Sequence, residues 1–290
     1  MTGPRETFDR FSGIRPLDAN DLVRLAIGFT AGLVFRITGL KRAYPAMGEM
    51  SPGIFVPHRG KPIRVRFGRG VINARPQEVG YYPGVYEPVT LSWFRPTPGQ
   101  TVIDVGAHVG AYTSIAAERG ARVIAVEPDR SNFELLTRNI RDNGFEDRVW
   151  TWPVALSDQS GRRRFYFSPG GNTYMSSLDR KWLLRDPRGD VVSTLVDCMT
   201  LDELAEACRL KTVDWVKVDV EGHSAQVLKG GAKTLAVAQN LMVEVPVDDA
   251  AVRNECLRLI EAAGLKVKSS EALGGERAAI SVSNWLCTRE

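Results

Sequence analysis

The chain has 290 residues, an apolar content of 43% and a formal net charge of +4, which excludes a protein too polar to build a core. This length accommodates one large domain, or one domain with an appendage. The charge is uneven, because residues 1–100 carry 14 Lys and Arg against 7 Asp and Glu.

The N-terminal residues predict a polar start followed by a helix over about 20–40. Its apolar run, 25–35, is too short to span a bilayer, so packing on the protein is favoured over membrane-surface contact or dimerisation. The first residues lack a signal-peptide apolar region, and the four cysteines show no metal-binding spacing. These features predict a reducing, cytoplasmic setting.

Residues 51–77 contain six basic side chains and no acid. Attraction of an anionic substrate, a nucleic acid or a membrane surface is one interpretation, but alternation with apolar residues over 63–67 favours a solvated strand face. Strands are predicted at 63–67 and 70–73, with a short helix at 89–94. We therefore expect residues 1–95 to form a helical and extended cap, and residues 96–290 to form the main domain.

Residues 101–128 predict a strand, a glycine turn, a helix and a second strand that ends in an acid. Downstream, strands are predicted at 149–156, 213–220 and 241–245, with a final antiparallel pair at 265–268 and 279–287. Helices are predicted between them, with Ser131 and Thr200 as caps. An inserted hairpin is expected beyond 156, followed by an irregular segment, 175–187, that could line a pocket. This alternation predicts an α/β, doubly wound, mostly parallel sheet of seven strands.

The glycine turn reads Asp104-Val105-Gly106-Ala107-His108-Val109-Gly110, which lacks the third glycine of a dinucleotide fingerprint. S-adenosylmethionine has no pyrophosphate, so the sequence favours this cofactor over NAD. The ammonium of S-adenosylmethionine suits an acidic side chain, and its carboxylate suits the backbone N–H groups of the turn. Glu127 suits the ribose hydroxyls, and Asp158 the adenine amine.

Ligands of such sheets bind at the carboxyl ends of the parallel strands. The predicted cofactor-binding residues within the sheet are Asp104, Gly106, Ala107, His108, Gly110, Glu127, Pro128, Ser157 and Asp158. The predicted catalytic residues are Asp219, Glu221 and His223, which follow Lys217 at alternate positions if the strand stays extended.

Asp219 is the first candidate for general base or substrate positioning. His223 is either the alternative base or a surface or capping residue, and Glu221 could instead cap the next helix. These residues and Glu244 could hold Mg²⁺ or Mn²⁺, but no spacing rule supports a metal and none is predicted.

Four stretches carry a family resemblance: DVGAHVGAYTSIAA, VIAVEPDRSNFELLTRNI, VALSD and KVDVEGHSAQVLKGG. In order and spacing, residues 86–245 resemble the FkbM family of S-adenosylmethionine-dependent methyltransferases. The resemblance implies a class I methyltransferase (Rossmann-like) fold and O-methylation of a sugar, glycan or natural-product hydroxyl. It implies cofactor binding by Asp104, Gly106, Gly110, Glu127 and Asp158, an active-site strand end at Asp219 and Glu221, and a cofactor contact at Glu87.

Ser224 stands where members of the family often have Glu, which leaves this chain without that acid. Two alternatives to a small-molecule O-methyltransferase are weighed. One is a nucleic-acid methyltransferase that uses the basic stretch 51–77, although no RNA-binding module follows. The other is a non-catalytic scaffold. The joint retention of four acids argues against it: Asp104, Glu127, Asp158 and Asp219.

Overall fold

The computed structural model describes residues 62–68, 70–75, 88–168, 176–185, 190–273 and 281–289. The expected helix over 20–40, about half of the basic stretch 51–77 and Glu87 lie outside them. The chain divides into two compact units, residues 1–88 and 89–290. In the first unit, β1 (Ile63–Phe67) and β2 (Gly70–Ala74) lie where two strands were predicted, and they pair as an antiparallel hairpin.

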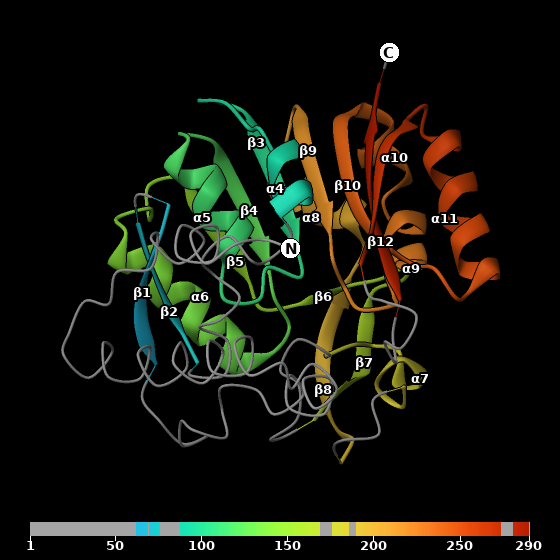
Figure 1. The fold of residues 1–290 in the computed structure, drawn as a ribbon, viewed down its shortest axis with the longest axis horizontal. Coiled ribbons are helices and arrows are strands. Elements are labelled where there is room, and N and C mark those ends of the chain that lie inside the picture. The colour runs from blue at the N-terminus through green and yellow to red at the C-terminus, as the bar shows by residue number, and fades with distance from the viewer. Residues whose placement is uncertain are drawn as a thin grey trace, which may run out of the picture. The chain divides into compact units, whose positions relative to one another are not determined.

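The second unit is built on a seven-stranded sheet in the order β11-β12-β10-β9-β3-β4-β5 (Figure 1). Adjacent strands from β5 to β10 are parallel, whereas β12 is antiparallel to both of its neighbours. This confirms the predicted mostly parallel α/β sheet. Its strands are β3 (Thr101–Val105), β4 (Arg122–Val126), β5 (Val149–Trp152), β9 (Val213–Val218), β10 (Ala238–Pro246), β11 (Lys266–Leu273) and β12 (Val282–Thr288).

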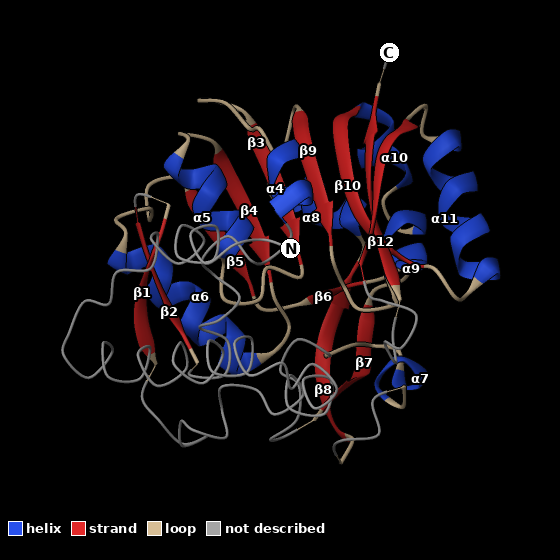
Figure 2. Ribbon diagram, in the orientation of Figure 1, coloured by secondary structure: helices blue, strands red, loops and turns tan. Residues whose placement is uncertain are grey.

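The central strands are buried along almost their whole length, because helices cover the sheet (Figure 2). Strands buried on both faces are rich in Val and Ile, as β3 and β4 are. The helices of the described residues are α4 (Pro88–Trp93), α5 (Ala111–Glu118), α6 (Arg130–Asp142), α7 (Arg180–Leu183), α8 (Leu201–Ala207), α9 (Ser224–Lys229), α10 (Ala232–Val237) and α11 (Ala250–Ala262). None of them is long and apolar enough to cross a membrane.

A second, three-stranded sheet has the order β6-β8-β7, with β6 (Ala155–Leu156), β7 (Gly161–Phe167) and β8 (Val192–Met199). The prediction of one strand over 149–156 is therefore wrong. The segment divides at Pro153, which lacks the N–H that a central strand needs. Its second half pairs with β8 and leads out of the large sheet.

Helix caps agree with the sequence in one case and differ in another. Thr200 caps α8 in a full capping box with Glu203, as predicted. Helix α6 is instead capped by Asp129, whose Oδ1 accepts from the N–H of Asn132 at 2.9 Å. The predicted cap, Ser131, lies inside the helix and donates its hydroxyl to the same Oδ1.

Candidate functional site

The glycine turn after β3 packs directly on the end of β9. Gly106 has a φ of 79°, and a Cβ at this position would lie 1.8 Å from the carbonyl oxygen of Asp219. Gly110 has a φ of 96°, and its Cβ would lie 2.7 Å from Leu136. Both glycines are thus required by backbone conformation and by close approach. The turn and the predicted catalytic strand end meet at Gly106.

The N–H groups of the turn mostly bond within the protein. Those of Gly106 and Ala107 both donate to the Val126 carbonyl at 3.0 Å, and that of Gly110 donates to Ala107. The N–H of His108 donates to Glu127 Oε2 at 2.8 Å. Binding of the methionine carboxylate by these groups stays a prediction, and four of them already have acceptors within the protein.

Glu127 is 4% exposed at the end of β4. Besides the N–H of His108, its carboxylate accepts from the N–H of Asp129 at 2.9 Å and the side chain of Asn132 at 3.4 Å. Burial raises the pKa of Glu127 to about 7, although these hydrogen bonds act to lower it. The carboxylate therefore organises the turn and titrates near neutral pH.

A buried cation joins two predicted acids. Lys217 of β9 is the register partner of Asp104 of β3, and its Nζ lies 3.7 Å from Asp104 Oδ1 and 3.1 Å from Asp219 Oδ2. The same Nζ lies 4.5 Å from the centroid of the Tyr112 ring, and Thr113 donates to Asp104 Oδ2 at 2.6 Å. Asp104 has no exposed surface, whereas the side chain of Asp219 is 18% exposed. Of the two, Asp219 is the acid that a ligand can reach.

The strand does not stay extended beyond Asp219. Glu221 has a φ of 51° and Gly222 a φ of 83°, so the chain turns sharply. The expected alternation of Asp219, Glu221 and His223 along one face is therefore wrong. Carboxylate oxygens of Asp219, Glu221 and Glu244 nonetheless lie within 4.8 Å of one another, and His223 is directed elsewhere. Three acids thus gather where β9 and β10 end.

Two residues from the inserted segment fix this turn, and neither was among the predicted site residues. The indole Nε1 of Trp182 donates to Glu221 Oε2 at 2.7 Å. The hydroxyl of Ser177 donates to the Glu221 carbonyl at 2.6 Å. The only signal in the sequence was that the irregular segment 175–187 could line a pocket, because no spacing links it to the turn.

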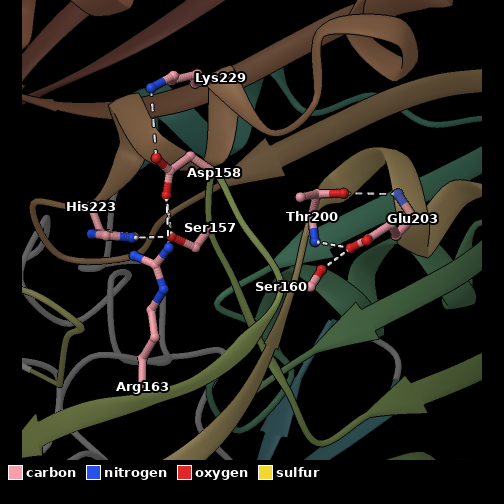
Figure 3. A network of polar contacts seen from close by, with 8 residues as sticks. All are labelled: Ser157, Asp158, Ser160, Arg163, Thr200, Glu203, His223 and Lys229. Atoms are coloured by element: carbon pink, nitrogen blue, oxygen red, sulfur yellow. Dashed lines mark hydrogen bonds and ion pairs between the residues drawn. The ribbon is translucent and has the colours of Figure 1, made fainter.

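His223 is a buried residue, 8% exposed, at the N-cap position of α9, where its side chain makes no capping bond. Its Nε2 lies 2.9 Å from the hydroxyl of Ser157 (Figure 3). Burial lowers the pKa of His223 to about 4, and the charge of Arg163 acts in the same direction. The ring is therefore neutral near pH 7, and the interpretation as a surface or capping residue is wrong.

Asp158 belongs to the same network (Figure 3). Its carboxylate accepts from Arg163 and Ser157, at 3.0 and 3.1 Å, and lies 3.6 Å from Lys229 Nζ. Burial alone would raise the pKa of Asp158, but these hydrogen bonds and charges outweigh it and lower the pKa. The carboxylate is thus ionised and held against α9. Nearby, Ser160, Thr200 and Glu203 form the capping network of α8.

The remaining predicted residues lie around these groups. Pro128 follows Glu127 and is partly exposed, whereas Ala107 is buried. Ser224, which replaces the acid frequent in the family, is fully buried and donates to the Glu244 carbonyl at 2.6 Å. This serine therefore ties α9 to β10.

The described residues fit a nucleoside-type cofactor. The glycine turn follows the carboxyl end of β3, and a buried carboxylate with a pKa near 7 stands at the end of the neighbouring strand. The sheet has the order β11-β12-β10-β9-β3-β4-β5, and β12 runs antiparallel between β10 and β11. This topology defines a class I methyltransferase fold. This is the class of protein to which fold and site belong.

The chain belongs to the FkbM methyltransferase family: the model of the methyltransferase FkbM domain matches residues 104–260. Hexuronic acid methyltransferase AglP of Haloferax volcanii is 31% identical over 144 residues, which are 49% of this chain and 54% of AglP. The 2-O-methyltransferase NoeI of Sinorhizobium fredii is 25% identical over 158 residues, 51% of this chain and 63% of NoeI. The chain thus spans little more than half the length of these relatives.

The 23S rRNA (uracil(1939)-C(5))-methyltransferase RlmD of Acidithiobacillus ferrooxidans is 26% identical over 188 residues, 64% of this chain and 40% of RlmD. Among solved structures, the methyltransferase FkbM from Methylobacillus flagellatus is 15% identical with a TM-score of 0.44. The match covers 66% of this chain and 44% of that one. What these comparisons show is a methyltransferase FkbM domain over residues 104–260, and the family of this domain implies S-adenosylmethionine as cofactor.

Proposed function

We propose that this protein transfers a methyl group from S-adenosylmethionine to a hydroxyl of a sugar, a glycan or a sugar-bearing natural product. The observation that carries the proposal is the contact between Gly106 and Asp219, which joins the cofactor turn to an accessible acid. Two relatives support a sugar acceptor, since one is named for hexuronic acid and the other for 2-O-methylation. A hexuronic acid or a neutral sugar is therefore the first acceptor to test.

In this proposal the cofactor is held by Gly106, Gly110, Glu127 and the residues around them, and Glu87 is a further contact. When bound, S-adenosylmethionine supplies an activated methyl group. The chain has to align the acceptor oxygen with that group, because alignment is the main source of rate enhancement for such a transfer. Asp219, held by Lys217 at 3.1 Å, accepts the acceptor hydroxyl's hydrogen bond and takes its proton.

The other predicted catalytic residues have different roles in this proposal. Glu221 lies beside Asp219 and binds a second acceptor hydroxyl, as a carboxylate with remaining acceptor capacity can. His223, whose Nε2 lies at the Ser157 hydroxyl, orients the end of α9 and is not the base. Residues 1–95 determine which acceptor enters. Arg59→Glu with Lys61→Glu should therefore change acceptor preference and leave cofactor affinity unchanged.

The test combines binding and transfer. Calorimetry with S-adenosylmethionine and with NAD identifies the cofactor. Transfer of a labelled methyl group is then measured to a methyl glucuronide, to neutral methyl hexosides and to ribosomal RNA. We expect Asp219→Asn to lose most transfer and keep cofactor affinity, whereas Asp197→Asn, at an exposed surface acid, changes neither.

Each other outcome contradicts the proposal in a distinct way. Methylation of RNA alone would favour the nucleic-acid alternative, which the similarity to RlmD keeps open. Cofactor binding without transfer to any probe would favour a scaffold. Binding of NAD in place of S-adenosylmethionine would overturn the cofactor assignment.

A further inference from the structure

We propose that Trp182 is a positioning residue, whose indole N–H fixes the Glu221 carboxylate in the orientation that meets the methyl acceptor. The inserted segment 176–185 then forms one wall of the acceptor site. This inference rests on the proposed function of Glu221 as an acceptor-binding acid. It adds a residue that the described geometry places in contact with Glu221 and that acts only through it.

The contact between Trp182 and Glu221 is a buried hydrogen bond to a charged acceptor. Trp182 is 1% exposed, and a buried indole N–H requires an acceptor. Its acceptor is Glu221 Oε2 at 2.7 Å, a carboxylate and not a backbone carbonyl. A hydrogen bond to a charged group is stronger and more directional than one between neutral groups. The bond therefore sets where this carboxylate lies.

Glu221 needs such a partner because its surroundings are unfavourable. Carboxylate oxygens of Asp219 and Glu244 lie within 4.8 Å of it, and like charges at this distance repel. Its backbone has a φ of 51°, a conformation that a residue with a side chain adopts only when its surroundings impose it. The indole N–H is a favourable partner that offsets part of this repulsion.

The indole ring also shapes the turn that carries Glu221. A Cβ on Gly222 would lie 2.5 Å from Cε3 of Trp182, so the indole ring packs directly against the backbone of Gly222. Ser177, on the same segment, donates to the Glu221 carbonyl at 2.6 Å. Side chain and backbone of Glu221 are thus both held by residues 176–185.

The segment that supplies these contacts is itself fixed on its other side. Arg185 stacks over the Trp182 ring at 4.7 Å and donates to Asp248 at 2.8 Å, just after β10. Trp182 and Leu183 pack on Val282 of β12. The indole is therefore a rigid support, as the positioning of a functional group requires.

The kinetic test is Trp182→Phe, which removes the indole N–H together with part of the ring and keeps an aromatic side chain at this buried position. With the glycoside acceptor found for the wild type, we expect kcat to fall about 10- to 100-fold, the size that follows from a misplaced reacting group. The Kd of S-adenosylmethionine should change less than about twofold. The matched control is Trp150→Phe, because Trp150 is 48% exposed on β5 and should leave every value unchanged.

A double-mutant cycle separates positioning from packing. If Trp182 acts through Glu221, Trp182→Phe should cost nothing further in a Glu221→Ala background. Additive losses in kcat, or a parallel loss of cofactor affinity, would show that the indole only supports the fold and would overturn the proposal.

A second readout needs no acceptor and so distinguishes failure of this inference from failure of the proposed function. The indole N–H resonance of Trp182 is identified in ¹⁵N-labelled protein as the one that Trp182→Phe removes. Glu221→Gln replaces the charged acceptor with a neutral amide, so we expect this resonance to shift in that variant while the other indole resonances stay in place. A resonance that Glu221→Gln leaves unchanged would overturn the contact even if the enzyme proved inactive on every glycoside.

Discussion

Gly106 on the β3 turn lies against the carbonyl oxygen of Asp219 at the end of β9, closer than any side chain could approach. The N–H of Asp219 also donates to the carbonyl of Val105, at 3.0 Å. The contact places the predicted cofactor turn and the predicted catalytic acid at one point of the sheet. Four predictions test this arrangement and the charges around it.

We expect Gly106→Ala to abolish cofactor binding and to destabilise the fold. A non-glycine residue at this φ costs about 1–2 kcal/mol, and the clash with Asp219 adds about 1–3 kcal/mol. Gly99→Ala is the matched control, because Gly99 has a φ of 81° and open space around its Cβ position. Thermal unfolding and calorimetry measure both effects. Equal behaviour of the two variants would show that the close approach to Asp219 carries no energy.

Replacement of Lys217 by Met should lower the free energy of unfolding by about 3–5 kcal/mol, because it leaves the fully buried Asp104 without its cation. The double variant Lys217→Met with Asp104→Asn should recover part of this loss, since no uncompensated charge then stays buried. Denaturant titration gives the values. No recovery in the double variant would mean that the ion pair with Asp104 is not what makes Lys217 necessary.

Affinity for S-adenosylmethionine should fall as the pH drops below about 7, where Glu127 takes up a proton. A ribose hydroxyl donates to the carboxylate better than to the carboxylic acid, so binding favours the ionised form. Calorimetry between pH 5.5 and 8.5, the span that brackets this pKa by about 1.5 units, measures the trend. Glu127→Gln should remove the trend. The control Glu134→Gln, at an exposed acid of α6, should retain it.

Two buried groups should make the free energy of unfolding depend on pH in opposite directions. The pKa of His223 is lowered from 6.5 to about 4, so its contribution is full above pH 6.5 and is lost as the pH falls through 4. The pKa of Glu127 is raised from 4.5 to about 7, so its contribution is full below pH 4.5 and is lost as the pH rises through 7.

His223→Gln should therefore make the protein relatively more stable on acidification from pH 6.5 to 4.5, because only the Glu127 contribution then varies in this range. Glu127→Gln should show the reverse slope. Urea unfolding at several pH values separates the two. A profile for His223→Gln that parallels the wild type would mean that His223 has the same pKa in the folded and unfolded states.

Much of the fold follows from local patterns in the sequence. The structure contains the predicted apolar, β-branched strand β3, its glycine turn and the strand that ends before Glu127. These elements could be predicted because strand burial and turn formation depend on residues that are neighbours in the sequence. The capping box of Thr200 and the final antiparallel pair follow in the same way. Even the cap of α6 was misplaced by only two residues, from Asp129 to Ser131.

By itself the sequence determined the sheet, the glycine turn and the acids at the strand ends, because each depends on residues close together along the chain. Only the tertiary structure decided what each acid does. It buried Asp104 behind Lys217, held Glu221 on Trp182 39 positions earlier, and placed His223 at Ser157 66 positions away. Such contacts cannot be read from spacing, because they arise where β9 turns sharply at Glu221 and the inserted segment packs against it.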